Sequence, residues 1–314
     1  MKLKKCVTLM RATLDHKLRS RDDLARLNGG TLLGSIPKKS SGQGSSLVSE
    51  LRLDDPRGEA FRRLWTELRF AQVDDPNPAI LVTSAQPKEG KTSTGINLAI
   101  TAARSGNRVA LVDVDLRQPT VASKLGLENS VGLTTVLLGA ADLTELFQPW
   151  GTDELYVLTA GKMVTNPLGL LDSRAMSTLM NRLNAEFDMV ILDGPPVLTA
   201  ADSLVLAKHV GQLLLVTAVG EVRVNHVEEA LRALSAAEVP TGIVLNKVPG
   251  SAAESAHQVR HSSWSATLRD VQPTDLQLWD LASTPRAHAW ATEYEHLAPP
   301  EGLHTATSHV RSQP

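Results

Sequence analysis

A short loop that contains both glycine and lysine lies directly between an apolar strand and a helix, and this feature limits the possible folds most strongly. Ile80–Thr83 is a β-branched and apolar run, which predicts a buried strand. The loop Ala85–Thr92 follows at once, and apolar residues at helical spacing predict a helix over Thr92–Arg104. Successive N–H groups in such a loop, together with the N-terminus of the next helix, bind phosphate. The pattern therefore predicts a site for a nucleotide triphosphate rather than a chance match in a turn.

The residues of this loop have separate expected roles. We expect Lys91 to reach the β- and γ-phosphates of ATP, and the hydroxyl of Thr92 to bind Mg²⁺. Two positions lack the glycines that such loops often carry: Ala85 requires a negative φ, and Lys88 stands where a second glycine is common. The predicted nucleotide-binding residues of this segment are Gln86, Pro87, Lys88, Glu89, Gly90, Lys91, Thr92 and Ser93.

Carboxylates follow two further apolar strands. Arg108–Val112 leads into Asp113 and Asp115, and residues two apart on a strand point to one side, so both can face one site. Two carboxylates this close are costly unless a cation or a proton lies between them. Asp193 directly follows the run Met189–Leu192, which is the usual place for an acid that helps to hold Mg²⁺. The alternative for Asp113 and Asp115 is a pair of solvated aspartates at a strand end.

Strands and helices alternate along the chain, which predicts an α/β fold. We expect a P-loop NTPase-like, mostly parallel β-sheet flanked by helices on both faces, with the site at the carboxyl ends of the strands. Asn246 closes the last strand at that edge, where it either contacts the nucleotide base or forms a turn. The other expected strands and helices are Leu213–Thr217, Gly242–Asn246, Glu59–Phe70, Ser173–Asn184 and Asn225–Ala237.

The composition is ordinary for a soluble globular protein. The chain has 314 residues, of which 42% are hydrophobic and 21% charged, and its net charge is −2. A charge so close to zero argues against nucleic acid as a partner. Cys6 is the sole cysteine, which excludes a disulfide framework and fits a reducing cytoplasm. The sequence has no apolar run long enough to span a bilayer and no visible secretory signal.

Three regions of the chain differ in composition. Residues 1–50 form a basic N-terminal segment, with a helix expected over Leu14–Asn28 and a flexible linker over Lys38–Ser46. The basic residues are either a solvated terminus or a segment attracted to an anionic membrane surface. Residues 51–250 contain the predicted strands and form the ATP-binding domain. Residues 251–314 lack lysine and hold most of the histidines without cysteine partners, which predicts a disordered polar tail rather than a metal site.

Several segments resemble those of one protein family. SAQPKEGKTS, LVDVDLRQP and VILDGPP, which begin at Ser84, Leu111 and Val190, resemble the Walker A, A′ and B motifs of bacterial tyrosine kinases. In that family they belong to the cytoplasmic module of Wzc-like proteins of capsule and exopolysaccharide synthesis. Arg19–Pro37 resembles the segment that follows the second membrane helix in such proteins, and Glu59–Phe70 resembles the helix before the first strand.

The resemblance implies a function and a set of site residues. It implies an ATP- and Mg²⁺-dependent protein tyrosine kinase, an autokinase that regulates capsular or exopolysaccharide polymerisation and export. Lys91 would act on the phosphates and Asp113 as the base for the acceptor tyrosine, with Mg²⁺ held by Thr92, Asp115 and Asp193. It further implies a transmembrane polysaccharide co-polymerase as the activating partner, and a cytoplasmic position at the inner face of the plasma membrane.

The chain departs from the family pattern in two places. The family's ring-forming helix has Glu, Arg and Arg at intervals of three, whereas this chain has Glu59, Arg62 and Trp65, so we expect a weak homo-oligomer at most. The family's C-terminal tyrosine cluster is missing. Tyr156 lies in a predicted core strand, where we expect it to be buried, and Tyr294 is the only tyrosine of the tail.

Two other functions stay open. A nucleotide-gated regulatory subunit of polysaccharide export with little kinase activity would explain the missing tyrosine cluster. A partition-type P-loop ATPase of the ParA or MinD kind shares the loop class. Gln86 argues against the second alternative, because those proteins resemble this chain but carry a lysine early in the loop.

Overall fold

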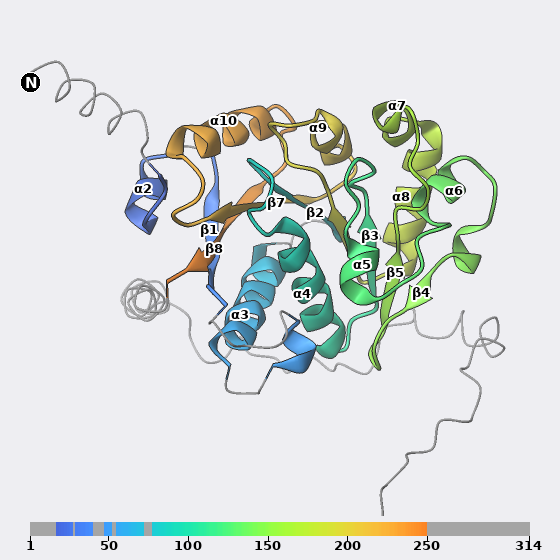
Figure 1. The fold of residues 1–314 in the computed structure, drawn as a ribbon, viewed down its shortest axis with the longest axis horizontal. Helices are drawn as coiled ribbons and strands as arrows, with labels where there is room; N and C mark the ends of the chain where they lie inside the picture. The colour runs from blue at the N-terminus through green and yellow to red at the C-terminus, as the bar shows by residue number, and fades with distance from the viewer. Residues whose placement is uncertain (1–16, 28, 40–46, 52–54, 72–76, 250–314) are drawn as a thin grey trace, which may run out of the picture. The chain divides into compact units, whose positions relative to one another are not determined.

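The centre of the computed structural model is a sheet of eight strands, and the structure describes residues 17–27, 29–39, 47–51, 55–71 and 77–249 (Figure 1). The strand order is β1-β8-β7-β2-β6-β3-β5-β4, and every neighbouring pair is parallel except β4 with β5. The strands are β1 (Thr31–Pro37), β2 (Ala79–Ser84), β3 (Val109–Asp113), β4 (Gln148–Pro149), β5 (Leu155–Leu158), β6 (Met189–Asp193), β7 (Gln212–Ala218) and β8 (Thr241–Val248).

Helices cover both faces of this sheet, as Figure 1 shows. The α-helices are α2 (Arg21–Ala25), α3 (Pro56–Ala71), α4 (Lys91–Arg104), α5 (Val121–Leu125), α6 (Leu133–Leu137), α7 (Pro167–Leu171), α8 (Arg174–Glu186), α9 (Asp202–Ala207) and α10 (Val224–Ser235), with short 3₁₀ turns η1 (Val48–Glu50) and η2 (Leu143–Glu145). Apolar residues of α3, α4 and α5 pack on one face, and those of α2 and α6 to α10 pack on the other. The predicted fold class is therefore confirmed.

The central strands are buried along their whole length because both of their faces are covered. Every residue of β2, β3, β6 and β7 is buried, which explains why these strands appear in the sequence as continuous apolar runs. β6 lies between β2 and β3 in the sheet and pairs in parallel with both. Their carboxyl ends therefore lie together, and Asp193 pairs in register with Val82 on one side and Asp113 on the other.

The N-terminal part differs from the expected helix over Leu14–Asn28, of which residues 17–27 are described. The expected helix is confirmed for residues 21–25 and wrong for residues 17–20: α2 begins at Arg21, because Ser20 caps it by accepting a hydrogen bond from Asp23 N–H. Leu18 is extended and fully buried. Its N–H donates to Val222 O at 2.9 Å, and its carbonyl accepts from Gly220 N–H at 2.7 Å. The N-terminal segment is thus bound beside the loop that follows β7.

The sheet also extends further toward the N-terminus than the sequence predicted. β1 lies before residue 51, the expected start of the ATP-binding domain, and pairs in parallel with β8. Gly34 of β1 faces α3, where an added Cβ would lie in ordinary contact with the Leu64 side chain, 3.4 Å away. The strand is only partly buried and contains a glycine, so it lacks the strong apolar pattern of the central strands.

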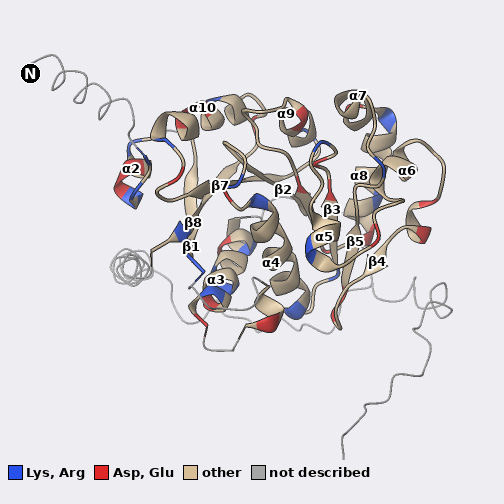
Figure 2. Cartoon of the chain, in the orientation of Figure 1, with Lys and Arg blue, Asp and Glu red and all other residues tan. Residues whose placement is uncertain are grey.

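The helix α3 corrects one expectation about assembly. Trp65 is only 6% exposed and belongs to the core between α3 and the sheet, so it does not lie on a docking surface as the family comparison suggested. The exposed side of the helix carries both signs of charge (Figure 2). Glu59 accepts from Arg62 and Arg63 at 2.9 Å each. The solvent side of α3 therefore carries these ion pairs and the exposed Phe70, and the Trp65 side chain is buried.

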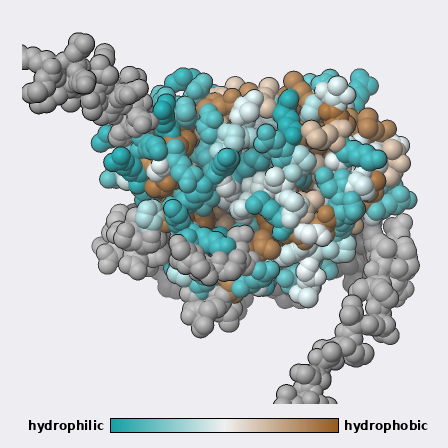
Figure 3. All heavy atoms as spheres, in the orientation of Figure 1, coloured by the Kyte–Doolittle hydropathy of each residue, from teal (hydrophilic) through white to brown (hydrophobic). Residues whose placement is uncertain are grey.

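Two further expectations concern membranes and the tail. Among the helices of the described residues, none combines the length and apolar character that a membrane crossing requires. The predicted disordered tail with Tyr294, the linker at 40–46 and the basic residues 1–16 lie outside the described residues. On the face that Figure 3 shows, hydrophilic and hydrophobic residues are intermixed.

Candidate active site

The phosphate loop connects β2 to α4 and takes a backbone path that explains its sequence. Gly90 has φ 99° and stands at the N-cap of α4, where an added Cβ would come within 2.1 Å of the Asn246 amide nitrogen. Lys88, at the position often held by glycine, has φ 70° and so adopts the left-handed conformation without a glycine. Ala85 has no positive φ, as expected. Pro87 and Lys88 are exposed at the crest of the loop.

A buried carboxylate holds this loop from the inside. Glu89 is 3% exposed; its Oε1 accepts from Gln86 N–H at 2.6 Å and its Oε2 accepts from Ala218 N–H at 3.0 Å. Burial raises the pKa of Glu89 to about 7, although these two backbone hydrogen bonds act in the opposite direction. Sequence reasoning placed Glu89 among the nucleotide-binding residues. In the structure its side chain faces β7, so only its backbone is available to a phosphate.

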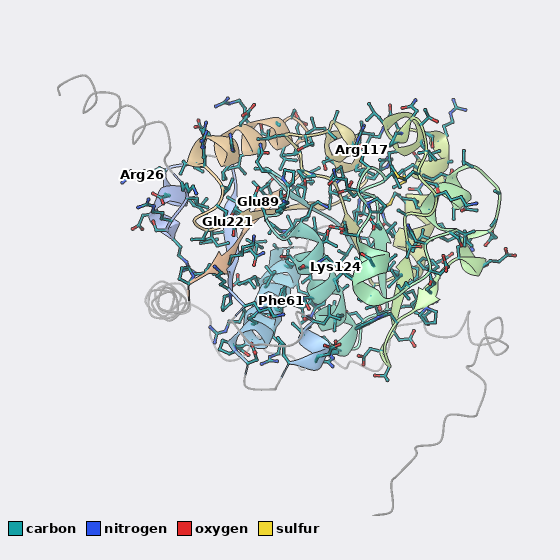
Figure 4. All side chains as sticks on the ribbon, viewed as in Figure 1. Arg26, Phe61, Glu89, Arg117, Lys124 and Glu221 are labelled. Atoms are coloured by element: carbon teal, nitrogen blue, oxygen red, sulfur yellow. The ribbon has the colours of Figure 1, made fainter. Side chains whose placement is uncertain are left out.

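Two residues of β8 hold the loop from outside. Asn246 Nδ2 donates to Glu89 O at 2.9 Å, and Asn246 Oδ1 accepts from Lys247 N–H at 2.8 Å. The Lys247 ammonium donates to Lys88 O at 2.8 Å and to Glu221 Oε2 at 2.5 Å. Glu89 and Glu221 lie near one another in Figure 4. Both polar ends of the Asn246 side chain are therefore engaged within the protein, and its predicted contact with the base stays a prediction.

Lys91 faces the carboxylates at the ends of β3 and β6. Its Nζ lies 2.8 Å from Asp115 Oδ2 and 3.9 Å from Asp193 Oδ1, and it donates to Thr92 Oγ1 at 3.4 Å. Burial lowers the pKa of Lys91, but Asp193 and Asp115 outweigh that effect, so the pKa is raised. The structure thus brings together four of the residues predicted from sequence. Ser93, one position further along α4, bonds through its carbonyl to Asn97.

Asp193 is the least satisfied polar group of the site. Its side chain is 0% exposed, and neither carboxylate oxygen has a hydrogen-bond partner. Burial raises the pKa of Asp193 to about 6, while Lys91 acts in the opposite direction. A buried carboxylate without hydrogen bonds is costly unless a cation approaches it. Asp193 is therefore suited to act with a bound cation.

Asp113 has a structural role that the sequence did not indicate. It is fully buried, and its Oδ1 accepts from Asp115 N–H at 3.2 Å. Its Oδ2 accepts from Thr120 N–H at 3.1 Å and Val121 N–H at 3.0 Å, which fixes the start of α5. Burial raises the pKa of Asp113, and the Asp193 carboxylate raises it further. The alternative of a solvated aspartate pair is wrong, since Asp115 is buried as well.

The residues present fit Mg²⁺ as a partner of phosphate oxygens. Within the described ranges, no cluster of three or more His, Cys, Asp or Glu side chains is arranged to hold a metal by itself. Mg²⁺ is commonly bound through one or two carboxylates together with substrate phosphates. Thr92, Asp115 and the buried Asp193 supply oxygen atoms of that kind beside the phosphate loop.

Several residues around the site were missed by sequence reasoning. Glu221 and Lys247 hold the loop, yet neither belongs to a motif, and a lysine after an apolar strand gives no signal of its own. Arg117 belongs to the segment LVDVDLRQP, but the sequence assigns it no role. Its guanidinium makes two hydrogen bonds to Asp202, at 2.7 and 3.0 Å. Tyr156 lies in β5 as predicted but is only half-buried, and its hydroxyl donates to Glu154 Oε2 at 3.0 Å.

Comparisons with known proteins identify the family of the chain. A family model described as "ParA: NUBPL iron-transfer P-loop NTPase" matches residues 76–265. The tyrosine-protein kinase YwqD of Bacillus subtilis is 40% identical over 177 residues, which cover 56% of this chain and 75% of that protein. The tyrosine-protein kinase etk of Escherichia coli is 34% identical over 202 residues, or 63% of this chain but only 28% of that protein.

The structural comparison identifies the matching part of the longer relative. The solved kinase domain of the Escherichia coli tyrosine kinase ETK superposes with a TM-score of 0.64 and 30% identity, covering 70% of this chain and 91% of that domain. The chain therefore spans less than a third of full-length etk but nearly all of its kinase domain.

Proposed function

Because the chain belongs to the bacterial tyrosine-protein kinases of the P-loop NTPase class, we propose that it transfers the γ-phosphoryl group of ATP, with Mg²⁺, to tyrosine. One observation carries the proposal: beside a phosphate loop, Lys91 faces Asp115 and the buried carboxylate of Asp193, with Thr92 adjacent. A partition-type ATPase would have the same kind of phosphate loop. However, YwqD and etk, which are 40% and 34% identical to this chain, are named tyrosine-protein kinases.

Each residue would contribute position or charge to the transfer. The loop N–H groups and Lys91 bind the phosphates, which places the γ-phosphoryl group against the acceptor. Thr92, Asp115 and Asp193 would hold Mg²⁺, which when bound neutralises charge on the phosphate oxygens. Asp113 would accept the proton of the tyrosine hydroxyl; burial raises its pKa to about 8, so it would first have to lose its own proton to act as this base. The turn at 115–121 covers Asp113 and would have to shift for the hydroxyl to reach it.

The process we propose is control of capsular or exopolysaccharide polymerisation and export. The activating partner would be a transmembrane polysaccharide co-polymerase, with this chain in the cytoplasm at the inner face of the plasma membrane. The bound position of Leu18 supports regulation from the N-terminal side. Leu18 contacts the backbone of Gly220 and Val222, which flank Glu221, and Glu221 bonds to the lysine that holds the phosphate loop.

The acceptor we propose is Tyr294, to be phosphorylated by a second copy of the chain. The half-buried Tyr156 is the less favourable candidate. Its ring packs against Phe147 and Phe187, and Arg108 lies over its face at 5.2 Å. A tyrosine held in this way would have to leave its strand environment to enter another active site.

The test is to incubate the purified chain with ATP and Mg²⁺, with and without the cytoplasmic segment of the transmembrane co-polymerase, and to map phosphotyrosine by mass spectrometry. We expect little signal from the chain alone and a clear signal at Tyr294 with the partner. A Lys91→Met chain serves as the inactive control. If ATP binds but no phosphotyrosine forms with the partner, the chain is instead the nucleotide-gated regulatory subunit.

A further inference from the structure

The helix α9 begins beside all three motif loops, although none of its residues belongs to a motif. Asp202 and Ser203 are its first two residues, and both are 0% exposed. The side chain of Arg117 lies beside α9 in Figure 4. These two buried polar residues contact segments that come from three separate parts of the chain.

Asp202 holds the turn that carries Asp115. Its Oδ2 accepts from Arg117 Nε at 2.7 Å, and its Oδ1 accepts from Arg117 Nη2 at 3.0 Å, so the pair is bidentate. Arg117 lies two residues after Asp115, and Asp115 Oδ1 accepts from Gln118 N–H at 3.0 Å within the same turn. Because the Asp202 carboxylate is fully buried, the guanidinium is the partner that compensates its charge.

Ser203 holds the loop that follows Asp193. The Ser203 hydroxyl donates to Pro195 O at 2.6 Å, and the Thr83 hydroxyl donates to the same oxygen at 2.7 Å. Thr83 lies in β2, just before the phosphate loop. Asp193 is the last residue of β6, so the position of its carboxylate depends on the backbone that carries it. Ser203 and Thr83 fix that backbone two residues beyond Asp193.

We propose that Asp202 and Ser203 are positioning residues that set the separation between Asp115 and Asp193, and thereby the affinity of the site for Mg²⁺. The proposal rests on the proposed nucleotide site and adds the residues that hold its two carboxylates in place. Mg²⁺ requires nearly ideal octahedral geometry, so small displacements of a ligand weaken its binding. Loss of a residue that orients a metal ligand typically costs 10- to 100-fold in metal affinity.

The experiment measures ADP binding by calorimetry, first in EDTA and then across a Mg²⁺ titration, for Arg117→Ala, Asp202→Asn, the double variant and Ser203→Ala. In each single variant, we expect about a tenfold rise in the Mg²⁺ concentration at which ADP binding is enhanced half-maximally. The affinity for ADP in EDTA should be unchanged. The double variant Arg117→Ala/Asp202→Asn should need no more Mg²⁺ than either single variant, because both changes remove the same Arg117–Asp202 pair. Asp172→Asn is the matched control, since it breaks the exposed ion pair at the other end of α9, with Lys208.

The possible outcomes separate this inference from the proposed function. The positioning role is overturned if Arg117→Ala and Ser203→Ala respond to Mg²⁺ as the unmodified chain does. It is also overturned if these variants lose as much ADP affinity in EDTA as they lose in Mg²⁺. If Asp202→Asn or Arg117→Ala fails to fold, Ser203→Ala decides, because in that variant the Thr83 hydroxyl still donates to Pro195 O. An unmodified chain that binds no ADP with Mg²⁺ overturns the proposed function and this inference together.

Discussion

Lys91 Nζ lies 2.8 Å from Asp115 Oδ2, so the residue proposed to bind phosphate is paired with a residue proposed to bind Mg²⁺. A phosphate that binds Lys91 breaks its pair with Asp115, which leaves Asp115 available to Mg²⁺. Mg²⁺ that binds Asp115 breaks the same pair and leaves Lys91 available to phosphate. The geometry predicts that nucleotide and Mg²⁺ bind cooperatively, each raising the affinity for the other by the same factor.

Replacing Lys91 by Met should weaken ATP binding at least about tenfold, because a charge-assisted contact contributes roughly 1.5–3 kcal/mol. Calorimetry with and without Mg²⁺ measures the change. Lys208→Met is the control, since Lys208 pairs with Asp172 at the surface, away from the phosphate loop. Unchanged affinity in Lys91→Met would contradict the assignment of the phosphate loop.

Replacing Asp193 by Asn should stabilise the nucleotide-free protein while reducing its response to Mg²⁺. The carboxylate is buried without a hydrogen bond, so removing its charge lifts a penalty on the order of 1 kcal/mol or more. Thermal unfolding in EDTA should therefore show a higher Tm than the unmodified chain. Adding ADP and Mg²⁺ should raise the Tm of the unmodified chain more than that of the variant. A lower Tm in EDTA would show that Asp193 stabilises the fold.

Glu89 should make the protein less stable as pH rises through neutrality. Its pKa is raised by burial from 4.5 to about 7 in the folded state, so the folded chain binds more protons than the unfolded chain between these values. The free energy of unfolding therefore falls as pH increases from about 4.5 to 7, by about 1–3 kcal/mol from this residue. The charges nearest to Glu89 are those of Lys247 and Glu221.

Urea unfolding at pH 5 and pH 8, without nucleotide or Mg²⁺, measures this slope. Glu89→Gln should have a flatter dependence than the unmodified chain. Asp113 and Asp193 also have a raised pKa and contribute in the same direction, so the difference between the two chains isolates Glu89. Identical slopes in both chains would mean that Glu89 is already ionised at pH 5.

Trp65→Arg should destabilise the fold rather than promote assembly. Trp65 is buried between α3 and the sheet, and loss of a buried aromatic side chain costs about 3–5 kcal/mol before the new charge is considered. Urea unfolding measures the loss, and Arg62→Ala, at an exposed position of α3, is the control. Light scattering should show a monomer or small oligomer for the unmodified chain, and a stable ring would refute that expectation.

The central strands and the motif residues could be predicted from sequence because their signals are local. A strand buried on both faces is an apolar run, and an acid directly after it marks the carboxyl edge of the sheet. These local signals predict β2, β3 and β6, and they predict that Lys91, Asp115 and Asp193 belong to one site. The phosphate loop can be predicted although Lys88 replaces a common glycine, because an apolar strand precedes the loop and a helix follows it.

The remaining features depend on contacts between distant segments, which have no fixed spacing. Asp202 is one acidic residue among many until the fold places it against Arg117. The family pattern places Trp65 where an exposed arginine is expected, because a sequence pattern gives the residue type at a position but not its burial. The short α2 was overestimated because its helix-forming residues continue toward Leu18, whose hydrogen bonds to another loop keep it extended.

The pairing of β1 with β8 has a consequence for how the protein folds. The two strands come from opposite ends of the described chain, so β1 has no partner until β8 has been synthesised. The strands from β2 to β7 can form a sheet earlier, since N-terminal segments begin to fold during translation. A ribosome stalled with β7 outside its exit tunnel and β8 still inside would therefore carry strands β2 to β7 without a partner for β1. When β8 emerges, it pairs with β7 on one side and β1 on the other.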